Sequence, residues 1–158
     1  MAAGPDDLGT WFAELAGVWQ LTRDSSDGSR FTGTARFTAT DGNAYLLREE
    51  GFLRLATGEV LPASRQWVWR LTEHPAGERE IEIRYPQEAG GELYHRFRPE
   101  QAALPDSKGD AWHGEGEHLC GRDIYLAGYR LSARAIDIDH HVTGPAKDYR
   151  LKARLVRA

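Results

Sequence analysis

The chain has 158 residues, which fits a single domain spanning residues 1–158 and burying roughly 70% of the surface that the unfolded chain exposes. Its 20 basic and 24 acidic residues show no long run of one sign, so the sequence predicts neither a nucleic-acid-binding surface nor a basic membrane anchor. No stretch is apolar over the 18 or more residues that a membrane helix needs, and the single cysteine, Cys120, cannot form an internal disulfide.

The first segment of the chain predicts a short helix. Asp6 or Asp7 can cap it, and Gly17 ends it. Between them, apolar residues recur at helical spacing: Leu8, Trp11, Phe12 and Leu15. The same segment carries acidic residues where a signal peptide needs a basic stretch followed by an apolar run, so we expect a cytoplasmic protein.

Everything after Gly17 is predicted to be strand and turn. The predicted strands span residues 18–24, 30–39, 44–55, 61–72, 79–85, 92–98, 111–120, 122–131, 135–143 and 148–156. The turn signals between them include Asp27-Gly28, Asp41-Gly42-Asn43, Thr57-Gly58, Pro75-Ala76-Gly77, Gly90-Gly91 and Gly144-Pro145. The polar stretch 99–110 is predicted to be a loop. This spacing favours an all-β antiparallel barrel of eight to ten strands, with the helix over or near an open end.

Two neighbouring strands place charged residues on an apolar face. Side chains alternate across a strand, so Glu49 shares a face with apolar neighbours, and Arg65 shares one with Trp67 and Trp69. If the turn at Thr57-Gly58 joins the two strands, position 49 lies opposite 67 and diagonal to 65. We therefore expect a buried ion pair between Glu49 and Arg65, which serves either the fold or a ligand. The two tryptophans belong either to the core or to a ligand-facing wall.

Further polar residues are predicted to point inward with the apolar residues of their strands: His95, His118, Cys120 and His140. Asp123 and Tyr125 are out of phase with His118, and a bulge at Gly121 would bring them to the same side. Taken singly, a buried histidine is usually a hydrogen-bonded core residue, and a cysteine a small buried apolar one. A dry core tolerates few such groups unless each has a partner, so their number favours a wet cavity.

Two longer motifs carry a resemblance to a known family. The segments His118-Leu119-Cys120-Gly121-Arg122-Asp123-Ile124-Tyr125 and Gly144-Pro145-Ala146-Lys147-Asp148-Tyr149 resemble the HxCxxDxY and GPxKDY signatures of an uncharacterised bacterial family, domain of unknown function 6314. Gly17-Val18-Trp19 resembles the start of lipocalins and related calycins. The resemblance implies a calycin-like (lipocalin-like) barrel and carries no activity with it. At His140 the sequence departs from the family pattern, which has an aromatic residue there.

The leading functional hypothesis is a small-molecule binding protein. Its lumen takes a partly apolar ligand with a carboxylate or carbonyl group, which Arg65 anchors. The residues predicted to contact the ligand are Glu49, Arg65, Trp67, Trp69, His95, His118, Cys120 and Tyr125.

Three alternatives remain open at this stage. The first is an isomerase, dehydratase or cyclase in which His118 is the general base, Asp123 orients it, and Tyr125 is an acid or oxyanion donor. The second is a haem or metal site drawn from His95, His118, Cys120, Asp123 or His140. The third is a filled barrel with a structural or interaction role. The sequence assigns no cofactor and no oligomeric state.

Overall fold

The computed structural model describes residues 7–102 and 111–158. Within them the chain forms one α-helix, α1 (Asp7–Ala13), a 3-10 turn at Gln87–Ala89, and eleven strands. The strands are β1 (Gly17–Ser25), β2 (Arg30–Asp41), β3 (Ala44–Arg54), β4 (Val60–Glu73), β5 (Arg79–Arg84), β6 (Leu93–Phe97), β7 (Glu100–Ala102), β8 (Ala111–Cys120), β9 (Asp123–Ser132), β10 (Ala135–Gly144) and β11 (Lys147–Arg157). Ten of them match predicted strands to within two residues at either end.

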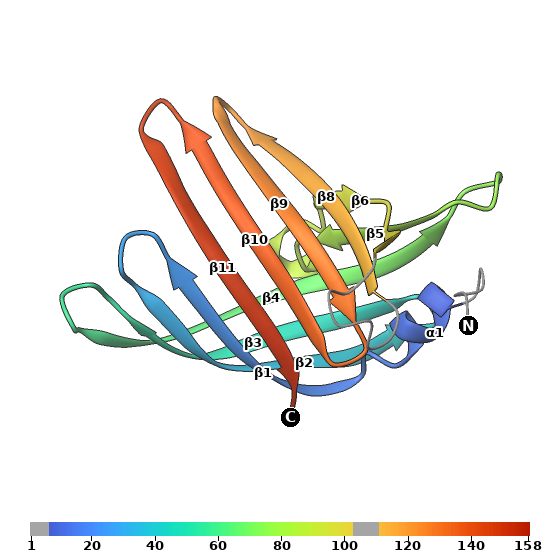
Figure 1. The fold of residues 1–158 in the computed structure, drawn as a ribbon, viewed down its shortest axis with the longest axis horizontal. Coiled ribbons are helices and arrows are strands. Elements are labelled where there is room, and N and C mark those ends of the chain that lie inside the picture. The colour runs from blue at the N-terminus through green and yellow to red at the C-terminus, as the bar shows by residue number, and fades with distance from the viewer. Residues whose placement is uncertain (1–6, 103–110) are drawn as a thin grey trace.

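The strands form one antiparallel sheet in the order β6-β5-β4-β3-β2-β1-β11-β10-β9-β8-β7. Neighbours in the sheet are also neighbours in the chain, except that β1 pairs with β11. The first and last strands therefore lie side by side in the middle of the sheet. The sheet curls into a half-barrel, so that β3 and β4 lie across from β8–β10 (Figure 1).

One strand of the described chain, β7, was not predicted. The predictions of a loop over 99–110 and of eight to ten strands were therefore wrong. Arg98 and Pro99 link β6 directly to β7, so one extended segment pairs with β5 through its first half and with β8 through its second half. The inward side chains of β6, Phe97 and His95, pack against Gly114 and Gly116 of β8. A Cβ on Gly116 would lie 2.9 Å from the Cβ of His95, so the close approach requires a glycine. The remainder of the predicted loop, 103–110, lies outside the described residues.

The helix α1 closes one end of the half-barrel (Figure 1). It ends at Ala13 rather than at Gly17, and two hydrogen bonds hold it: Trp11 Nε1 donates to the Ser132 carbonyl at 2.7 Å, and the Tyr45 hydroxyl donates to the Ala13 carbonyl at 2.9 Å. In the described part of the chain, no helix is long and apolar enough to span a membrane.

A layer of large buried side chains fills the half of the barrel next to α1. Phe37 packs edge-on against both Trp19 and Trp69, with ring centroids 6.0 and 5.5 Å apart. Phe97 stacks on Tyr129 with centroids 4.2 Å apart. Because this layer occupies the helix end, any lumen lies toward the opposite, open end. The hairpins β1–β2, β3–β4, β8–β9 and β10–β11 turn at that end, away from α1 (Figure 1).

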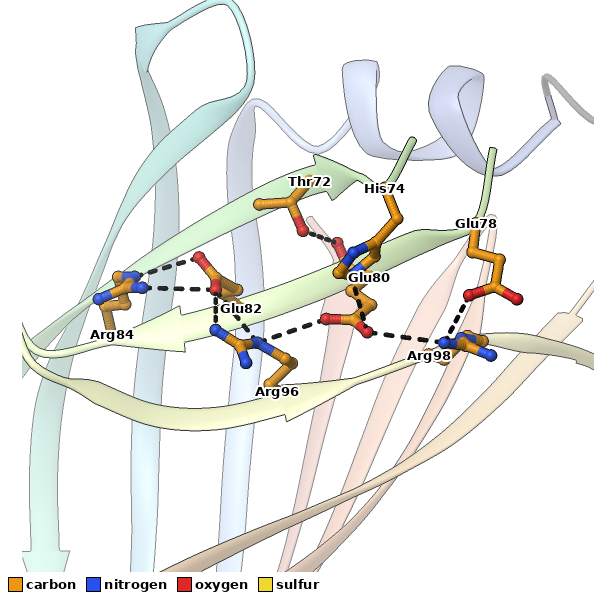
Figure 2. A network of polar contacts seen from close by, with 8 residues as sticks. All are labelled: Thr72, His74, Glu78, Glu80, Glu82, Arg84, Arg96 and Arg98. Carbon is orange, nitrogen blue, oxygen red and sulfur yellow. Dashed lines mark hydrogen bonds and ion pairs between the residues drawn. The ribbon is translucent and has the colours of Figure 1, made fainter. Parts of the chain in front are cut away.

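On the outer face of β5 and β6, alternating charges form a network of ion pairs (Figure 2). Glu82, which is only 6% exposed, receives hydrogen bonds from Arg84 and Arg96, and Arg96 also pairs with Glu80. Burial alone would raise the pKa of Glu82, but the two guanidinium groups outweigh it and hold that pKa below its usual range. The network fixes β6 to β5 and thereby positions the tyrosines that these strands bring to the inner face.

Candidate functional site

A cavity of about 250 Å³ lies inside the open half of the barrel, and we call it the main cavity. Its polar and aromatic lining comes from eight strands and the segment after β5: Arg23, Glu49, Arg65, Trp67, Trp69, Tyr85, Tyr94, His118, Cys120, Tyr125, Tyr129, His140 and Tyr149. Seven of the eight predicted ligand-contacting residues are among these. The exception is His95.

An ion triad forms one wall of the main cavity. Arg65 donates from Nε to Oε1 of Glu49 at 2.6 Å, and Arg23 Nη2 reaches both carboxylate oxygens of Glu49, at 2.9 and 3.0 Å. The predicted pair of Glu49 with Arg65 is therefore present, and Arg23 is a third member that the prediction missed. Arg23 reaches across β2 to Glu49 because the inward residues of β2 between them are small, Gly33 and Ala35.

The register between β3 and β4 differs from the prediction. Glu49 lies directly opposite Arg65, and position 67 lies opposite Leu47. The predicted pairing placed the turn around Thr57-Gly58, whereas the hairpin uses a five-residue loop, 55–59, closed by a hydrogen bond from the Leu55 N–H to the Glu59 carbonyl. Shifting the turn moves the partner of Glu49 by two residues, which preserves the inward face and changes the opposing side chain.

The triad carries a net positive charge inside the barrel. Burial alone would raise the pKa of Glu49, but Arg23 and Arg65 together outweigh it and hold that pKa below its usual range, so the carboxylate stays ionised. Burial lowers the pKa of Arg23, but the usual pKa of a guanidinium group is so high that Arg23 stays protonated. Two cations therefore face one anion. Among the described residues, Nε of Arg23 is buried and has no hydrogen-bond partner.

Aromatic rings form a second wall of the main cavity, next to the triad. Trp67 lies with its ring centroid 5.1 Å from that of Tyr85 and 4.8 Å from that of Tyr94, and Arg65 lies over its face at 5.2 Å. Tyr94 in turn contacts His118 at 5.1 Å. The result is a continuous ring surface that begins beside the cations.

Tyr94 reaches the lumen through an irregularity that the sequence did not predict. Ile83 pairs with His95, but the next residue of β5, Arg84, pairs with Leu93, so Tyr94 is an extra residue in β6. The bulge lets both Tyr94 and His95 face inward. Tyr85, another missed tyrosine, follows the alternation of Ile81 and Ile83, so its inward position was visible in the sequence.

His95 is fully buried behind the aromatic wall and not in it. Its Nε2 lies 3.1 Å from the Tyr125 carbonyl and must donate to it, which leaves Nδ1 to accept from the Tyr129 hydroxyl at 2.5 Å. Burial lowers the pKa of His95 to about 4, so the imidazole is neutral. His95 was predicted to contact the ligand, but both of its ring nitrogens are hydrogen-bonded within the protein, so its role is structural.

His140, by contrast, lines the main cavity with an unused nitrogen. Its Nδ1 is buried and has no hydrogen-bond partner in the described part of the chain. Burial and then the nearby His95, Arg65 and Arg23 lower its pKa to about 3, so this imidazole is neutral too.

The signature residues at the β8–β9 hairpin converge on one side, as predicted, but without a bulge. Gly121 and Arg122 form a two-residue turn, with Gly121 at φ +61°, so Cys120 lies opposite Asp123 and His118 opposite Tyr125. Residues directly opposite on paired strands share a face. The cysteine is exposed at the open end, so the alternative of a buried apolar cysteine was wrong.

The proposed partnership between His118 and Asp123 is absent. Asp123 forms an ion pair with Lys147 at 3.1 Å, and within residues 7–102 and 111–158 the His118 side chain makes no hydrogen bond or ion pair and lies against the rings of Tyr85, Tyr94 and Tyr125. The prediction that Asp123 orients His118 as a general base was therefore wrong. The enzymatic alternative loses the dyad on which it depended.

A second cavity of about 160 Å³ adjoins the main cavity, and both are lined by Arg23, Glu49, Arg65 and Leu151. Its other walls are mostly apolar and include Phe31, Leu53 and Ala63. The ion triad thus lies between the aromatic main cavity and a smaller, mostly apolar one.

The metal alternative finds no support in the side-chain arrangement. Across the described ranges, no three His, Cys, Asp or Glu side chains are grouped so that they could hold a metal ion. The histidines of the lumen are engaged by rings and hydrogen bonds instead.

Comparisons with known proteins give a family and a set of structural likenesses. The model of a family of unknown function (DUF6314) matches residues 15–157, and no curated protein matches the chain. A fluorescence-activating β-barrel designed de novo is similar at 13% identity and a TM-score of 0.46, over 93% of this chain and 96% of that one. The redesigned β-barrel mFAP0, bound to DFHBI, is similar at 14% identity and a TM-score of 0.44, over 90% of this chain and 98% of that one.

Proposed function

Because the chain belongs to a family of unknown function (DUF6314), we propose its function from its own site: it is a small-molecule binding protein. The ligand is a partly apolar compound with a carboxylate or carbonyl group, held in the lumen of the half-barrel. The observation that carries this proposal is the ion triad, in which two guanidinium groups face one carboxylate beside an aromatic wall.

The charge balance of the triad favours an anionic group on the ligand. Glu49 neutralises one of the two cations, and the Nε of Arg23 is a buried donor without a partner in the described chain. An unsatisfied buried donor costs roughly 1 to 3 kcal/mol. A carboxylate accepts hydrogen bonds from guanidinium groups in a planar, bidentate geometry, so it suits both the charge and the free donor.

The size and walls of the two cavities favour a ligand with an aromatic or otherwise planar part. The main cavity alone is smaller than the roughly 300 to 1,000 Å³ usual for ligand sites, and together with the second cavity it reaches that range. A flat ring in the main cavity would lie against Trp67 and Tyr94, with its acid group toward the triad.

Titration with aromatic and fatty carboxylates tests the proposal, followed by intrinsic fluorescence, because Trp67 and Trp69 line the main cavity. We expect saturable quenching or enhancement, and a loss of affinity of about 10-fold or more in Arg65→Gln, since hydrogen bonds between charged groups contribute roughly 1.5 to 3 kcal/mol. Arg70→Gln is the matched control, because Arg70 lies on the same strand and pairs with Asp41 on the outer face. Equal losses in both variants, or no response to any acid, would contradict the proposal.

Two broader expectations belong to the same proposal. The calycin-like kinship that the motifs imply fits an antiparallel half-barrel with a lumen at one end. A cytoplasmic location fits an exposed Cys120 that has no second cysteine in the sequence, because a reducing compartment keeps such a thiol free.

A further inference from the structure

The two signature motifs meet at the open end of the barrel. The first motif contains the turn of the β8–β9 hairpin and supplies Asp123 and Tyr125. The second contains the turn of the β10–β11 hairpin and supplies Gly144 and Lys147. Since β10 pairs with both β9 and β11, these hairpins are adjacent. Nζ of Lys147 lies 3.1 Å from Oδ2 of Asp123 and 3.0 Å from the hydroxyl of Tyr125. We call Asp123, Tyr125 and Lys147 the rim cluster.

Gly144 makes room for the rim cluster. A Cβ at this position would lie 2.0 Å from Oδ1 of Asp123, far inside contact distance, so the carboxylate can lie against β10 only because residue 144 has no side chain. The half-buried Asp123 then fixes the ammonium of Lys147, whose pKa is raised by its hydrogen bonds to Tyr125 and Asp123. Gly144 thus admits Asp123, Asp123 binds Lys147, and Lys147 donates a hydrogen bond to the hydroxyl of Tyr125.

The direction of these hydrogen bonds leaves the Tyr125 proton available. A lysine ammonium has three donors and no acceptor, so the phenolic oxygen of Tyr125 accepts from Lys147. In the described part of the chain the hydroxyl has no other hydrogen-bond partner. Its ring lines the main cavity, 6.3 Å from Tyr94 and 6.0 Å from His118 between centroids.

The other wall tyrosines do not share this arrangement. The hydroxyl of Tyr129 donates to Nδ1 of His95 and is therefore used within the protein. Among the described residues, no charged side chain hydrogen-bonds to the hydroxyls of Tyr85, Tyr94 or Tyr149. Tyr125 alone among the described wall tyrosines combines a fixed position with a free proton.

We propose that Tyr125 is a second polar anchor of the main cavity, whose hydroxyl donates a hydrogen bond to a carbonyl oxygen on the ligand. This inference rests on the proposed function and narrows the ligand class to aromatic acids with a second, uncharged oxygen acceptor. The acid group binds at the triad, and the carbonyl group binds at the rim cluster. The positive charge of Lys147 beside the phenol makes Tyr125 a stronger donor, which favours an acceptor that carries partial negative charge.

Matched pairs of probes test the inference. Each pair compares an acetyl-substituted aromatic acid with the isopropyl-substituted acid of nearly the same shape: 3-acetylbenzoate and 3-isopropylbenzoate, 4-acetylbenzoate and 4-isopropylbenzoate, and the corresponding 6-substituted 2-naphthoates. The three spacings cover different separations between acid and carbonyl. For at least one pair we expect the acetyl compound to bind about fivefold more tightly, the ratio of one uncompensated neutral hydrogen bond.

Three variants identify the source of that preference. Tyr125→Phe keeps the ring, so the isopropyl compounds should bind as in the wild type while the ratio within the pair falls to about one. Lys147→Met should reduce the ratio at least twofold, because the hydroxyl loses its fixed position. Lys152→Met removes a cation from the outer face of the same strand and should leave the ratio unchanged.

The outcomes separate this inference from the function on which it rests. If the isopropyl acids bind and no pair shows a preference, or if the preference survives Tyr125→Phe, the rim cluster is not an anchor and the binding function stands. If none of the acids binds to the wild-type protein, the proposed function fails and the inference fails with it.

Discussion

Removing Glu49 tests whether the two arginines of the triad depend on it equally. The side chain of Arg23 is 12% exposed and that of Arg65 is 42% exposed. When Glu49→Leu removes the carboxylate, Arg65 can turn toward water, whereas Arg23 stays enclosed without a counter-charge. Breaking a buried ion pair from one side costs roughly 3 to 5 kcal/mol, so we expect a loss of that size, nearly all of it due to Arg23.

Two double-mutant cycles separate these contributions. In the first, Arg23→Met is combined with Glu49→Leu, and the double variant should lose about 2 to 3 kcal/mol less than the sum of the single variants. In the second, Arg65→Met is combined with Glu49→Leu, and the coupling should stay below about 1 kcal/mol, because a pair with one exposed partner is screened by water.

Urea unfolding, followed by tryptophan fluorescence and by circular dichroism, measures each free energy of unfolding. The comparison of the two cycles controls for general damage to the barrel, since both contain the same Glu49→Leu change. Additive losses in the Arg23 cycle would show that Glu49 does not hold this arginine. A larger coupling in the Arg65 cycle would show that exposure does not govern the strength of the two pairs.

Three further predictions concern the lumen and the rim. Burial lowers the pKa of His140 from 6.5 to about 3, so the unfolded chain takes up a proton that the folded chain does not, and stability falls as the pH drops below about 6.5. In urea titrations, His140→Phe should therefore lose about 3 kcal/mol less than the wild type between pH 7 and pH 4.5, and equal losses would contradict this. Gly144→Ala should lower the free energy of unfolding by about 1 to 3 kcal/mol through its clash with Asp123, and Asp123→Ala in the same chain should restore most of it. Ala63→Phe should fill the second cavity and weaken binding of 4-butylbenzoate while sparing benzoate, as isothermal titration would measure.

Alternation along strands predicted much of this site. The faces predicted for β3, β4 and β10 placed their residues correctly, because burial of one face fixes which side chains point inward regardless of the pairing partner. The outward positions of Ile124 and Leu126, 37% and 43% exposed, agree with the inward positions of Asp123 and Tyr125. The pairing of Glu49 with Arg65 also followed, because long side chains tolerate an error of two residues in register.

Alternation along single strands cannot predict contacts between strands that are not neighbours in sequence. Arg23 follows Trp19 and Leu21 on the inward face of β1, so its orientation was visible, but its partner lies two strands away. Whether it reaches Glu49 depends on the small residues of β2 and on the curvature of the sheet. The bulge at Tyr94 likewise depends on how β5 and β6 pair, and no turn residue marks it.

The error over Asp123 has the same origin and explains what the signature residues do. Read along the sequence, Asp123 follows His118 by five residues across the turn at Gly121, and the two suggest a catalytic dyad. In the sheet, however, the β10–β11 hairpin lies on the other side of β9 and offers a lysine, whose ammonium group forms a charge-assisted ion pair with the carboxylate. The second motif, GPxKDY, supplies both that lysine and the glycine that lets the carboxylate approach. The two motifs therefore build the rim cluster together, and His118 belongs to the aromatic wall.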